Sequence, residues 1–279
     1  MIMIWTIFKE LNLIDNNNII GLMFIPEVYK LYHNNPYNNF KHAFVVFRNS
    51  YLIYRKIKHQ IELTKLELFS LLIAALCHDI DHPGITNKNA KKILEEHHVS
   101  VVISLMSKHN IMDRFDDIKR PEIIQIISDL ILSTNMQYHN DIVTKLSNIK
   151  KFNNISDRDK LLAMKGIIKM ADLSNELSEE ADLWSYAIID EFKKEAVEFG
   201  PDTMSIDLTK YNHMKSQSWF VSNIVLRLYV EMSILFPLLC DFRNAIERRV
   251  SIYSTASESS INSVNLLEST NNIFNSMNK

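Results

Sequence analysis

The chain has 279 residues, with 31 basic and 33 acidic side chains and a formal net charge of −2. This nearly balanced charge lacks the basic excess that marks a nucleic-acid-binding protein, so we expect no nucleic-acid partner. Only 4 glycines occur, and because all-β folds need many glycine-containing turns, the composition favours a mostly helical chain.

Apolar residues recur at helical spacing along most of the sequence. The first segment, residues 1–19, begins with an apolar stretch that is too short to span a bilayer, and we interpret it as an N-terminal extension. The periodicity then predicts helices over Phe40–Ile57, Leu63–Leu76, Asn89–Ser107, Pro121–Leu132, Asp157–Leu173, Ala181–Phe199 and Lys215–Leu239.

These helices predict one compact all-α domain of many helices over residues 20–248, because no strand-like alternation, internal repeat or interdomain linker is present. The tail, residues 249–279, is rich in Ser and Asn, and we expect it to be disordered. The longest apolar stretch, Trp219–Cys240, contains Arg227 and Glu231, which favours a buried amphipathic helix over a membrane span.

The strongest chemical signal is the run His78-Asp79-Ile80-Asp81-His82, directly after an apolar helix. Imidazoles and carboxylates bind divalent cations, and one carboxylate can bridge two metal ions. The alternative is a polar helix end with capping aspartates, but buried His and Asp side chains are costly without partners.

Two further candidates lie in other apolar segments. His42 stands near the start of one predicted helix, where it could also be an ordinary core histidine. Asp172 stands at the end of another, where it could also cap the next helix. Together with His78 and Asp79 they form the pattern expected of a metal-dependent hydrolase with two metal ions.

Five segments in this order resemble the motifs of the catalytic domain of class I cyclic nucleotide phosphodiesterases, which belong to the HD-domain superfamily. The resemblance extends over about Pro36 to Leu239. The sequences PYNNFKHA and IIKMADLSNE are more similar to those of the cGMP-preferring branches of the family. The segments are HDIDHPGITN (78–87), LEEHH (94–98), LSTNMQYH (132–139), MADLSNE (170–176) and KSQSWF (215–220).

The resemblance implies hydrolysis of a cyclic purine nucleotide, cGMP or cAMP, to the nucleoside 5′-monophosphate in signalling. It implies that His42, His78, Asp79 and Asp172 hold a Zn²⁺ ion. Asp79 would also contact a second ion, Mg²⁺ or Mn²⁺.

The resemblance also assigns roles around the substrate. His82 matches a histidine near the phosphate, and Gln217 matches the glutamine that hydrogen-bonds the purine edge through its amide. Phe220 matches the aromatic residue that stacks on the purine, and Met136 matches a residue of the pocket wall. Without the resemblance, ordinary core packing would explain Phe220 and Met136.

The sequence departs from the family at the general acid. The family has a histidine four positions before the first metal-binding histidine, to protonate the leaving O3′ atom. Here that position holds Asn38, whose amide cannot give up a proton near neutral pH. Glu95 matches the residue that orients the absent histidine, so we expect it to have lost its partner and the activity to be reduced.

Three further departures concern the scaffold. The segment between Asn87 and Glu95 is shorter than in the family, Asn135 replaces the usual Asp, and few residues precede Asn38. Another part of a longer chain, an incomplete gene model or degeneration of the domain would explain the missing segments.

The sequence therefore leaves two hypotheses: a phosphodiesterase with impaired turnover, or an inactive relative that binds metal, nucleotide or a partner protein. A general HD-type nucleotidase is less consistent with Gln217 and Phe220. The two cysteines, Cys77 and Cys240, form no CxxC pair and indicate a reducing compartment, so we expect a protein of the cytoplasm or of the cytosolic face of a membrane. The choice between cGMP and cAMP stays open, as does the oligomeric state.

Overall fold

The computed structural model describes residues 2–11, 23–149, 156–201, 208 and 211–255. The described part contains helices and no strand, which confirms the predicted all-α class. The α-helices are α1 (Ile2–Glu10), α2 (Ile25–Leu31), α3 (Phe40–Ile57), α4 (Lys65–Cys77), α5 (Leu94–Lys108), α6 (Lys119–Thr134), α7 (His139–Ser147), α8 (Asp157–Asp172), α9 (Ala181–Phe199), α10 (His213–Phe220) and α11 (Leu226–Leu235), followed by a helical segment over residues 240–255.

The core is built around α4, whose residues Leu68–Cys77 are all buried. Helices α3 and α6 pack against α4, and α8 packs against both α3 and α6. A capping box fixes the start of α4: Thr64 accepts a hydrogen bond from the Glu67 backbone, and the Glu67 side chain accepts one from the Thr64 backbone. This reciprocal pair satisfies two backbone donors that a helix start leaves open.

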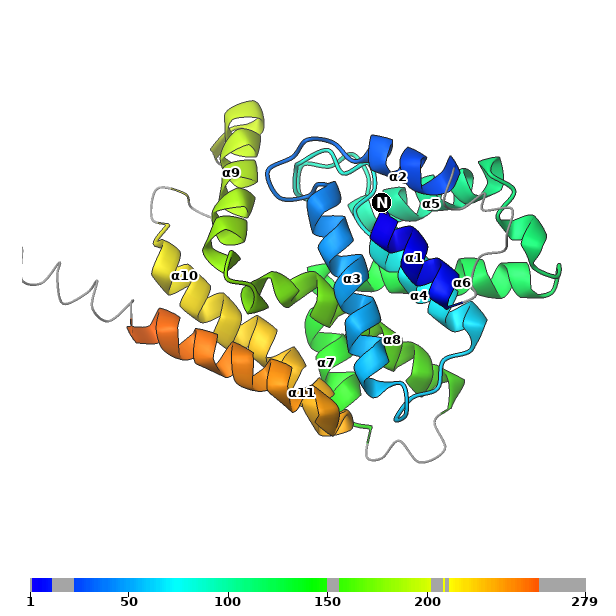
Figure 1. The fold of residues 1–279 in the computed structure, drawn as a ribbon. Coiled ribbons are helices and arrows are strands. Elements are labelled where there is room, and N and C mark those ends of the chain that lie inside the picture. Colours follow the sequence, from blue (N-terminus) through cyan, green and yellow to red (C-terminus); the bar gives the residue numbers. More distant parts are fainter. Residues whose placement is uncertain (1, 12–22, 150–155, 202–207, 209–210, 256–279) are drawn as a thin grey trace, which may run out of the picture.

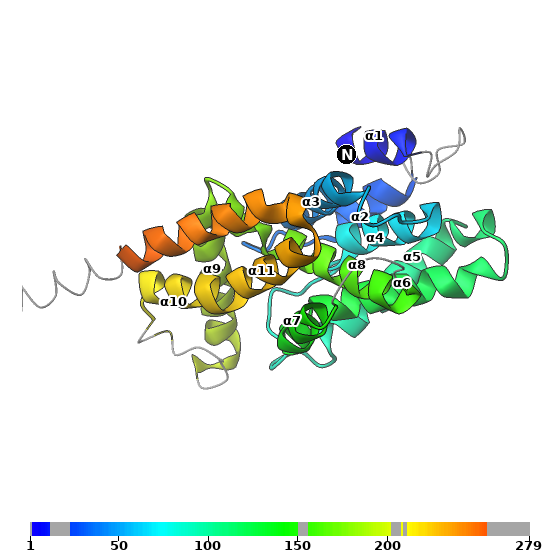
Figure 2. The same ribbon diagram turned by 90° about the horizontal axis from the view of Figure 1, so that it is seen from below.

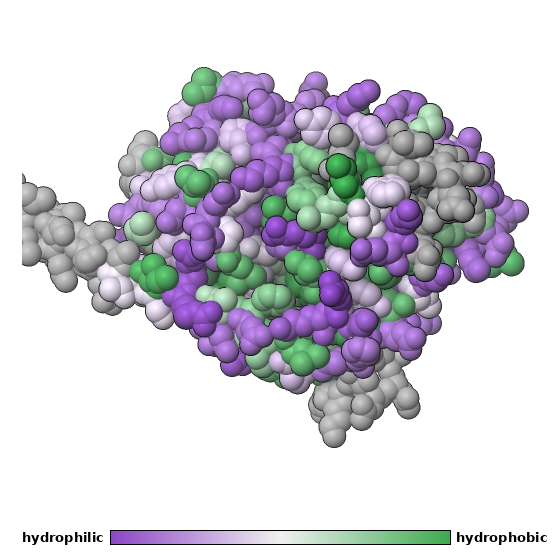
Figure 3. All heavy atoms as spheres, in the orientation of Figure 1, coloured by the Kyte–Doolittle hydropathy of each residue, from purple (hydrophilic) through white to green (hydrophobic). Residues whose placement is uncertain are grey.

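Helices α9, α10, α11 and the segment 240–255 form a second group beside this core (Figure 1). The segment 240–255, drawn in orange, runs back alongside α10 and α11 in both views (Figures 1 and 2). Hydrophilic side chains cover most of the outer face in this orientation, with smaller apolar areas between them (Figure 3).

The N-terminal extension joins the core rather than standing apart from it. In α1, Ile4, Ile7 and Phe8 are buried, and the Phe8 ring lies 5.6 Å from that of Phe47 and 6.2 Å from that of Phe69. Residues 12–19 of the extension lie outside the described residues.

The last long helix, predicted over Lys215–Leu239, is one continuous helix over His213–Leu235, so its predicted end lies four residues too far along the chain. Within it, α10 passes through a π-helical turn over Val221–Val225 into α11, which ends at Leu235. Phe236 leaves the helix with φ −126° and ψ 85°, because the ring of Pro237 disfavours helical geometry in the residue before it.

The helix predicted over Asn89–Ser107 begins later, at Leu94. The Asn87 side chain accepts a hydrogen bond of 2.7 Å from the Leu94 backbone and so satisfies a donor at the helix start. The predicted polar tail starts inside the helical segment 240–255, where Tyr253 is 1% exposed, and residues 256–279 lie outside the described residues.

One stretch, His213–Leu235, has the length and composition of a membrane-crossing helix, and 33% of its most apolar window is buried inside the protein. Core helices of soluble proteins can meet the same criteria, so this is weak evidence for a span. The expected absence of a membrane span stays a prediction.

Candidate metal centre and adjoining cavity

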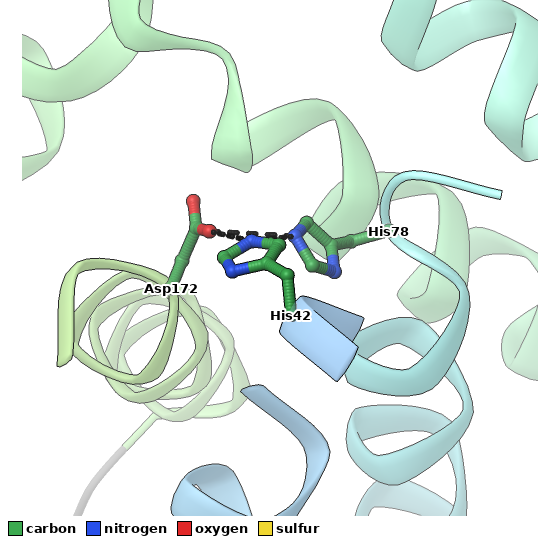
Figure 4. A group of neighbouring side chains, drawn as sticks. All are labelled: His42, His78 and Asp172. Carbon is green, nitrogen blue, oxygen red and sulfur yellow. Dashed lines mark hydrogen bonds and ion pairs between the residues drawn. The ribbon is translucent and has the colours of Figure 1, made fainter. Parts of the chain in front are cut away.

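Three predicted ligands meet at one point, although they come from distant parts of the chain. His42 lies in the first turn of α3, His78 directly follows α4, and Asp172 is the last residue of α8. Their side chains point toward one another (Figure 4). His42 Nε2 lies 3.2 Å from His78 Nε2 and 3.1 Å from Asp172 Oδ1, and His78 Nε2 lies 3.3 Å from Asp172 Oδ1.

The fourth predicted ligand, Asp79, lies beside these three residues. Its Oδ2 lies 3.2 Å from His78 Nε2 and 3.7 Å from His42 Nε2, so it stands as close to His78 as Asp172 does. The Asp79 carboxylate therefore faces both imidazoles.

This donor set fits a divalent cation. Neighbouring ligands about 2.1 Å from one ion are about 3.0 to 3.4 Å apart in octahedral or tetrahedral geometry, which is the spacing of the three closest atoms. His42 is 0% and His78 is 1% exposed. Two buried imidazole nitrogens that face each other at 3.2 Å cannot both carry a proton on that line, so an ion between them would resolve their conflict.

The neighbours of the two imidazoles set which nitrogen is free. His78 Nδ1 lies 3.1 Å from the Ala75 carbonyl, so Nδ1 donates and Nε2 keeps its lone pair for a cation. His42 Nδ1 lies 3.4 Å from the amide of Asn175, which also contacts the Tyr37 hydroxyl at 3.0 Å.

The Asn175 amide explains how His42 can be a ligand. Its Oδ1 is buried and has no hydrogen-bond partner among the described residues. Turned by 180°, the amide would let Oδ1 accept protons from both His42 Nδ1 and the Tyr37 hydroxyl. That orientation satisfies the buried oxygen and leaves His42 Nε2 free to bind a cation.

The ionised forms of the carboxylates suit this site. Burial alone would raise the pKa of Asp79 and Asp172, but the facing imidazoles outweigh it and hold the pKa of both carboxyls well below the usual range. Burial disfavours the imidazolium of His78, but the two carboxylates raise its pKa well above the ordinary value. The two carboxylates therefore favour a positive charge at this point, which a bound cation would supply in place of a proton on His78.

A cavity of about 730 Å³ opens over the cluster, which is the size range of small-molecule sites. The predicted residues that line it are Asn38, Asp79, Glu95, Met136, Asp172, Gln217 and Phe220. His82 lines a smaller neighbouring cavity of about 280 Å³, together with Asn38 and Glu95. The structure thus brings the predicted metal and substrate residues to one place, with His82 at its edge.

His82 is 8% exposed, and its Nδ1 accepts a hydrogen bond of 3.0 Å from the Gly84 backbone. A neutral His82 therefore carries its proton on Nε2. Its ring stacks on that of His98 with centroids 5.6 Å apart. Gly84 has φ +78°, a left-handed conformation that favours glycine.

Asn38 has a partner that the sequence did not indicate. Its Nδ2 donates to Glu191 Oε2 at 2.8 Å, and the backbone N–H groups of Tyr37 and Asn38 donate to Glu191 Oε1 at 2.7 Å. Glu191 comes from α9 and is 3% exposed. One buried carboxylate thus fixes both the side chain and the backbone at position 38.

Glu95 has acquired other contacts. Its Oε2 accepts from the side-chain amides of Asn87 and Asn135 at 3.0 Å each. The amide of Asn135, at the position where the resemblance leads us to expect Asp, can donate to this carboxylate, whereas an ionised Asp would repel it. The two departures from the family are therefore mutually consistent.

At the far end of the cavity, Gln217 is 7% exposed and Phe220 follows one turn later on α10. Gln217 Oε1 is buried and lacks a hydrogen-bond partner among the described residues. Met136 is 44% exposed and lies at the rim. These positions suit contact with a bound molecule.

Sequence reasoning missed four residues at the site: Asn175, Glu176, His98 and Glu191. Asn175 and Glu176 lie within the motif MADLSNE, and His98 lies within LEEHH. Membership of these motifs was therefore a signal that could have identified all three residues. His98 donates from Nδ1 to the Ile80 carbonyl at 2.6 Å, and burial lowers its pKa to about 4. Glu191 lies in an ordinary helical pattern, and no local signal marks it.

The fold and site define an all-α protein with a buried cation-binding group beneath a nucleotide-sized cavity. The family model described as 3′5′-cyclic nucleotide phosphodiesterase matches residues 37–246. The chain belongs to this family.

The relatives found by comparison agree with this assignment. The chain is 29% identical to the "cGMP-specific 3′,5′-cGMP phosphodiesterase 3" of Dictyostelium discoideum, over 91% of this chain and 59% of that protein. It is 31% identical to the "High affinity cGMP-specific 3′,5′-cyclic phosphodiesterase 9A" of Drosophila melanogaster, over 85% of this chain and 17% of that protein. It therefore spans about 59% of the length of the first relative and 17% of the second.

Among solved structures, the phosphodiesterase domain of Salpingoeca rosetta rhodopsin phosphodiesterase superposes with a TM-score of 0.84 at 23% identity. The match covers 95% of this chain and 89% of that one. This likeness shows that the fold is shared.

Proposed function

We propose that the chain hydrolyses a 3′,5′-cyclic purine nucleotide to the nucleoside 5′-monophosphate in a metal-dependent reaction. One observation carries the proposal: the His42, His78 and Asp172 cluster opens into a cavity whose far end holds Gln217 and Phe220. The metal-binding residues would face the phosphate of a nucleotide, and the wall with Gln217 and Phe220 would face its purine base.

For the cofactors, we propose Zn²⁺ held by His42, His78, Asp79 and Asp172, and Mg²⁺ or Mn²⁺ beside Asp79. Two imidazoles with carboxylates suit zinc, and a carboxylate with water suits magnesium. Such ions supply an activated water and neutralise charge on the phosphate. Within the protein, the Ala75 carbonyl would orient His78 and the Asn175 amide would orient His42. Gln217 would hydrogen-bond the purine edge and Phe220 would stack on the purine ring.

The leaving O3′ atom needs a proton, and position 38 does not provide one. The Asn38 amide already donates to Glu191 and has no proton to give up near neutral pH. We therefore propose slow turnover, since a general acid contributes about 10² to 10⁴ in rate. The fixed Asn38–Glu191 pair also supports the second candidate, an inactive relative that binds metal and nucleotide.

Replacing Asn38 with His tests both candidates. A histidine there would meet the Glu191 carboxylate, which could hold one ring N–H while the other nitrogen serves the leaving group. We expect Asn38→His to raise kcat for cyclic nucleotide hydrolysis by about 10² or more at pH 7, measured as release of the 5′-monophosphate by the zinc- and magnesium-loaded protein.

Asn38→Gln is the matched control, because it enlarges the side chain without adding a titratable group, and we expect no gain from it. Turnover of the natural chain at typical enzyme rates, about 1 to 10³ per second, would refute the slow-turnover proposal. Absence of turnover in both the natural chain and Asn38→His would favour the binding protein instead.

We further propose that the protein acts in the cytoplasm or on the cytosolic face of a membrane. The support is chemical: Cys77 and Cys240 are free thiols, as is usual in a reducing compartment. The proposed partner is the cyclic nucleotide itself.

A further inference from the structure

A separate cavity of about 420 Å³ runs along α3, and its volume lies within the range of small-molecule sites. None of the four predicted metal ligands lines it. Its remaining walls come from residues between 174 and 184 and from Phe242 of the segment 240–255. The α3 wall is made of residues that fall on one face of the helix, namely Lys41, Val45, Arg48, Asn49, Leu52 and Ile53.

Arg48 has unused hydrogen-bond donors in this wall. The residue is partly buried, and its Nε donates to Asn49 Oδ1 at 3.1 Å. In the described part of the chain no carboxylate pairs with its guanidinium group, whose two Nη atoms carry four further N–H groups. A guanidinium group can bind a carboxylate through two parallel hydrogen bonds. Arg48 is therefore suited to hold the carboxylate of a ligand.

The other two charged residues that line the cavity neutralise each other. Lys41 Nζ lies 3.0 Å from Glu180 Oε2, and the same ammonium group stands over the Trp184 ring, 5.0 Å from its centroid. Because Lys41, Arg48 and Glu180 are the charged residues of the lining, the cavity has a net positive charge. This charge is that of Arg48.

The cavity wall beyond Arg48, toward the end of α3, is apolar. Leu52 and Ile53 line it, and Leu52 is 42% exposed. Phe242 lies at the same end, because Lys56 Nζ of α3 stands 5.5 Å from the centroid of its ring. A ligand that covers these side chains would remove apolar surface from water, which favours binding.

The cavity also touches side chains that support the metal centre. Asn49 Nδ2 donates to Ser174 Oγ at 2.6 Å, and Ser174 Oγ donates to the Ala171 carbonyl, one residue before a predicted metal ligand. Asn175, whose amide contacts His42, lines both this cavity and the large one. A molecule in this cavity would therefore contact residues that help to position the metal ligands.

These features define a ligand with two chemically different ends. We propose that the cavity binds a small organic acid with an apolar body, whose carboxylate pairs with Arg48 and whose body covers Leu52 and Phe242. About 8 Å of helix separate Arg48 from Ile53, a span that the alkyl chain of octanoate covers. The proposed site is independent of the proposed hydrolysis, which takes place in the large cavity.

The test measures binding of octanoate to the metal-loaded full chain by isothermal titration calorimetry. We expect the natural chain to bind octanoate with a Kd of about 1 mM or lower. Arg48→Met should bind it at least about tenfold more weakly, because the variant loses the paired hydrogen bonds to the carboxylate while keeping much of the apolar side chain. Octanamide, which has the same alkyl chain without the charge, should also bind the natural chain at least about tenfold more weakly.

Arg55→Met is the matched control. Arg55 is an exposed residue of the same helix that does not line the cavity, so its replacement removes the same charge and should leave octanoate binding unchanged. Leu52→Glu keeps the inference testable if Arg48→Met does not fold. The partly exposed position should tolerate the change, and a carboxylate at the apolar end should weaken octanoate binding at least about tenfold.

Several results would overturn the inference. Absence of octanoate binding to the natural chain is one. Equal binding by the natural chain and Arg48→Met would place the carboxylate elsewhere, for example at the metal ions, and equal binding by Leu52→Glu would place the alkyl chain elsewhere. Octanamide that binds as tightly as octanoate would show that Arg48 does not recognise the charge. None of these results affects the proposed hydrolysis, which is assayed with cyclic nucleotide alone.

Discussion

Glu176 shows how one buried side chain can set a pH dependence. Burial raises its pKa to about 7, against the pull of Arg249 in the segment 240–255, which lowers it. The folded protein therefore keeps this proton between about pH 4.5 and pH 7, where the unfolded chain has lost it. The stabilising contribution of the neutral form is present at low pH and is lost as the pH rises through 7.

Replacing Glu176 by Gln should remove this dependence, because an amide does not ionise. We expect Glu176→Gln to match the natural chain in unfolding free energy at pH 5 and to exceed it at pH 8 by roughly 3 kcal/mol at most, from a pKa difference of 7 minus 4.5. Urea unfolding of both proteins at the two pH values measures it, and the comparison at each pH cancels the other titrating groups. Lower stability of the variant at pH 8 would show that attraction to Arg249 outweighs burial.

The start of α3 ties helix formation to the metal centre. Asn39 caps the helix by accepting from the backbone N–H groups of Lys41 and His42 at 2.8 and 3.1 Å. Its Nδ2 donates to the carbonyls of Asn35 and Pro36. One amide thus joins the preceding loop to the first turn, where His42 is placed.

Removing this cap should weaken both the fold and the metal site. We expect Asn39→Ala to cost about 1 kcal/mol of unfolding free energy and to lower zinc affinity, measured by competition with a chromophoric chelator. Asn39→Asp retains the acceptor at the helix start and should keep most of both. Zinc affinity in Asn39→Ala equal to that of the natural chain would show that the cap does not position His42.

Local sequence patterns predicted where the helices lie, and they predicted the helix ends only where several signals agree. The bounds of α3 and α9 coincide with the predicted Phe40–Ile57 and Ala181–Phe199, because apolar periodicity, the cap before α3 and Gly200 after α9 all agree. The helix predicted over Lys215–Leu239 is present but ends at Leu235, and apolar periodicity did not indicate the π-helical turn inside it. At its end the effect of Pro237 on its neighbour outweighed periodicity.

Across the whole molecule, the sequence pointed to the metal cluster but not to the contacts that tune it. His42, His78 and Asp172 stood out as polar residues in apolar segments, and the structure brings them together. The link from Asn38 to Glu191 joins positions 153 residues apart. No local pattern carries that information, because such a contact depends on how α9 packs over the loop.

The contacts of His213 with Ser185 and Tyr211 could not be predicted from the sequence either. The sequence left the amide orientation of Gln217 open, since an amide can present either its oxygen or its nitrogen to a ligand. In the structure the Gln217 side chain contacts the Tyr211 hydroxyl, and Tyr211 belongs to none of the motifs.

The central claim is metal-dependent hydrolysis, and the most direct measurement is the conversion of cGMP by the purified natural chain. We expect 5′-GMP as the product, detected by chromatography, with formation that depends on added Zn²⁺ and Mg²⁺ and stops on chelation. Asp172→Asn, which keeps the side chain's size but weakens a ligand, should bind less zinc and form less product. A chain that binds no zinc, or that forms 5′-GMP equally well with Asn at position 172, would contradict the account.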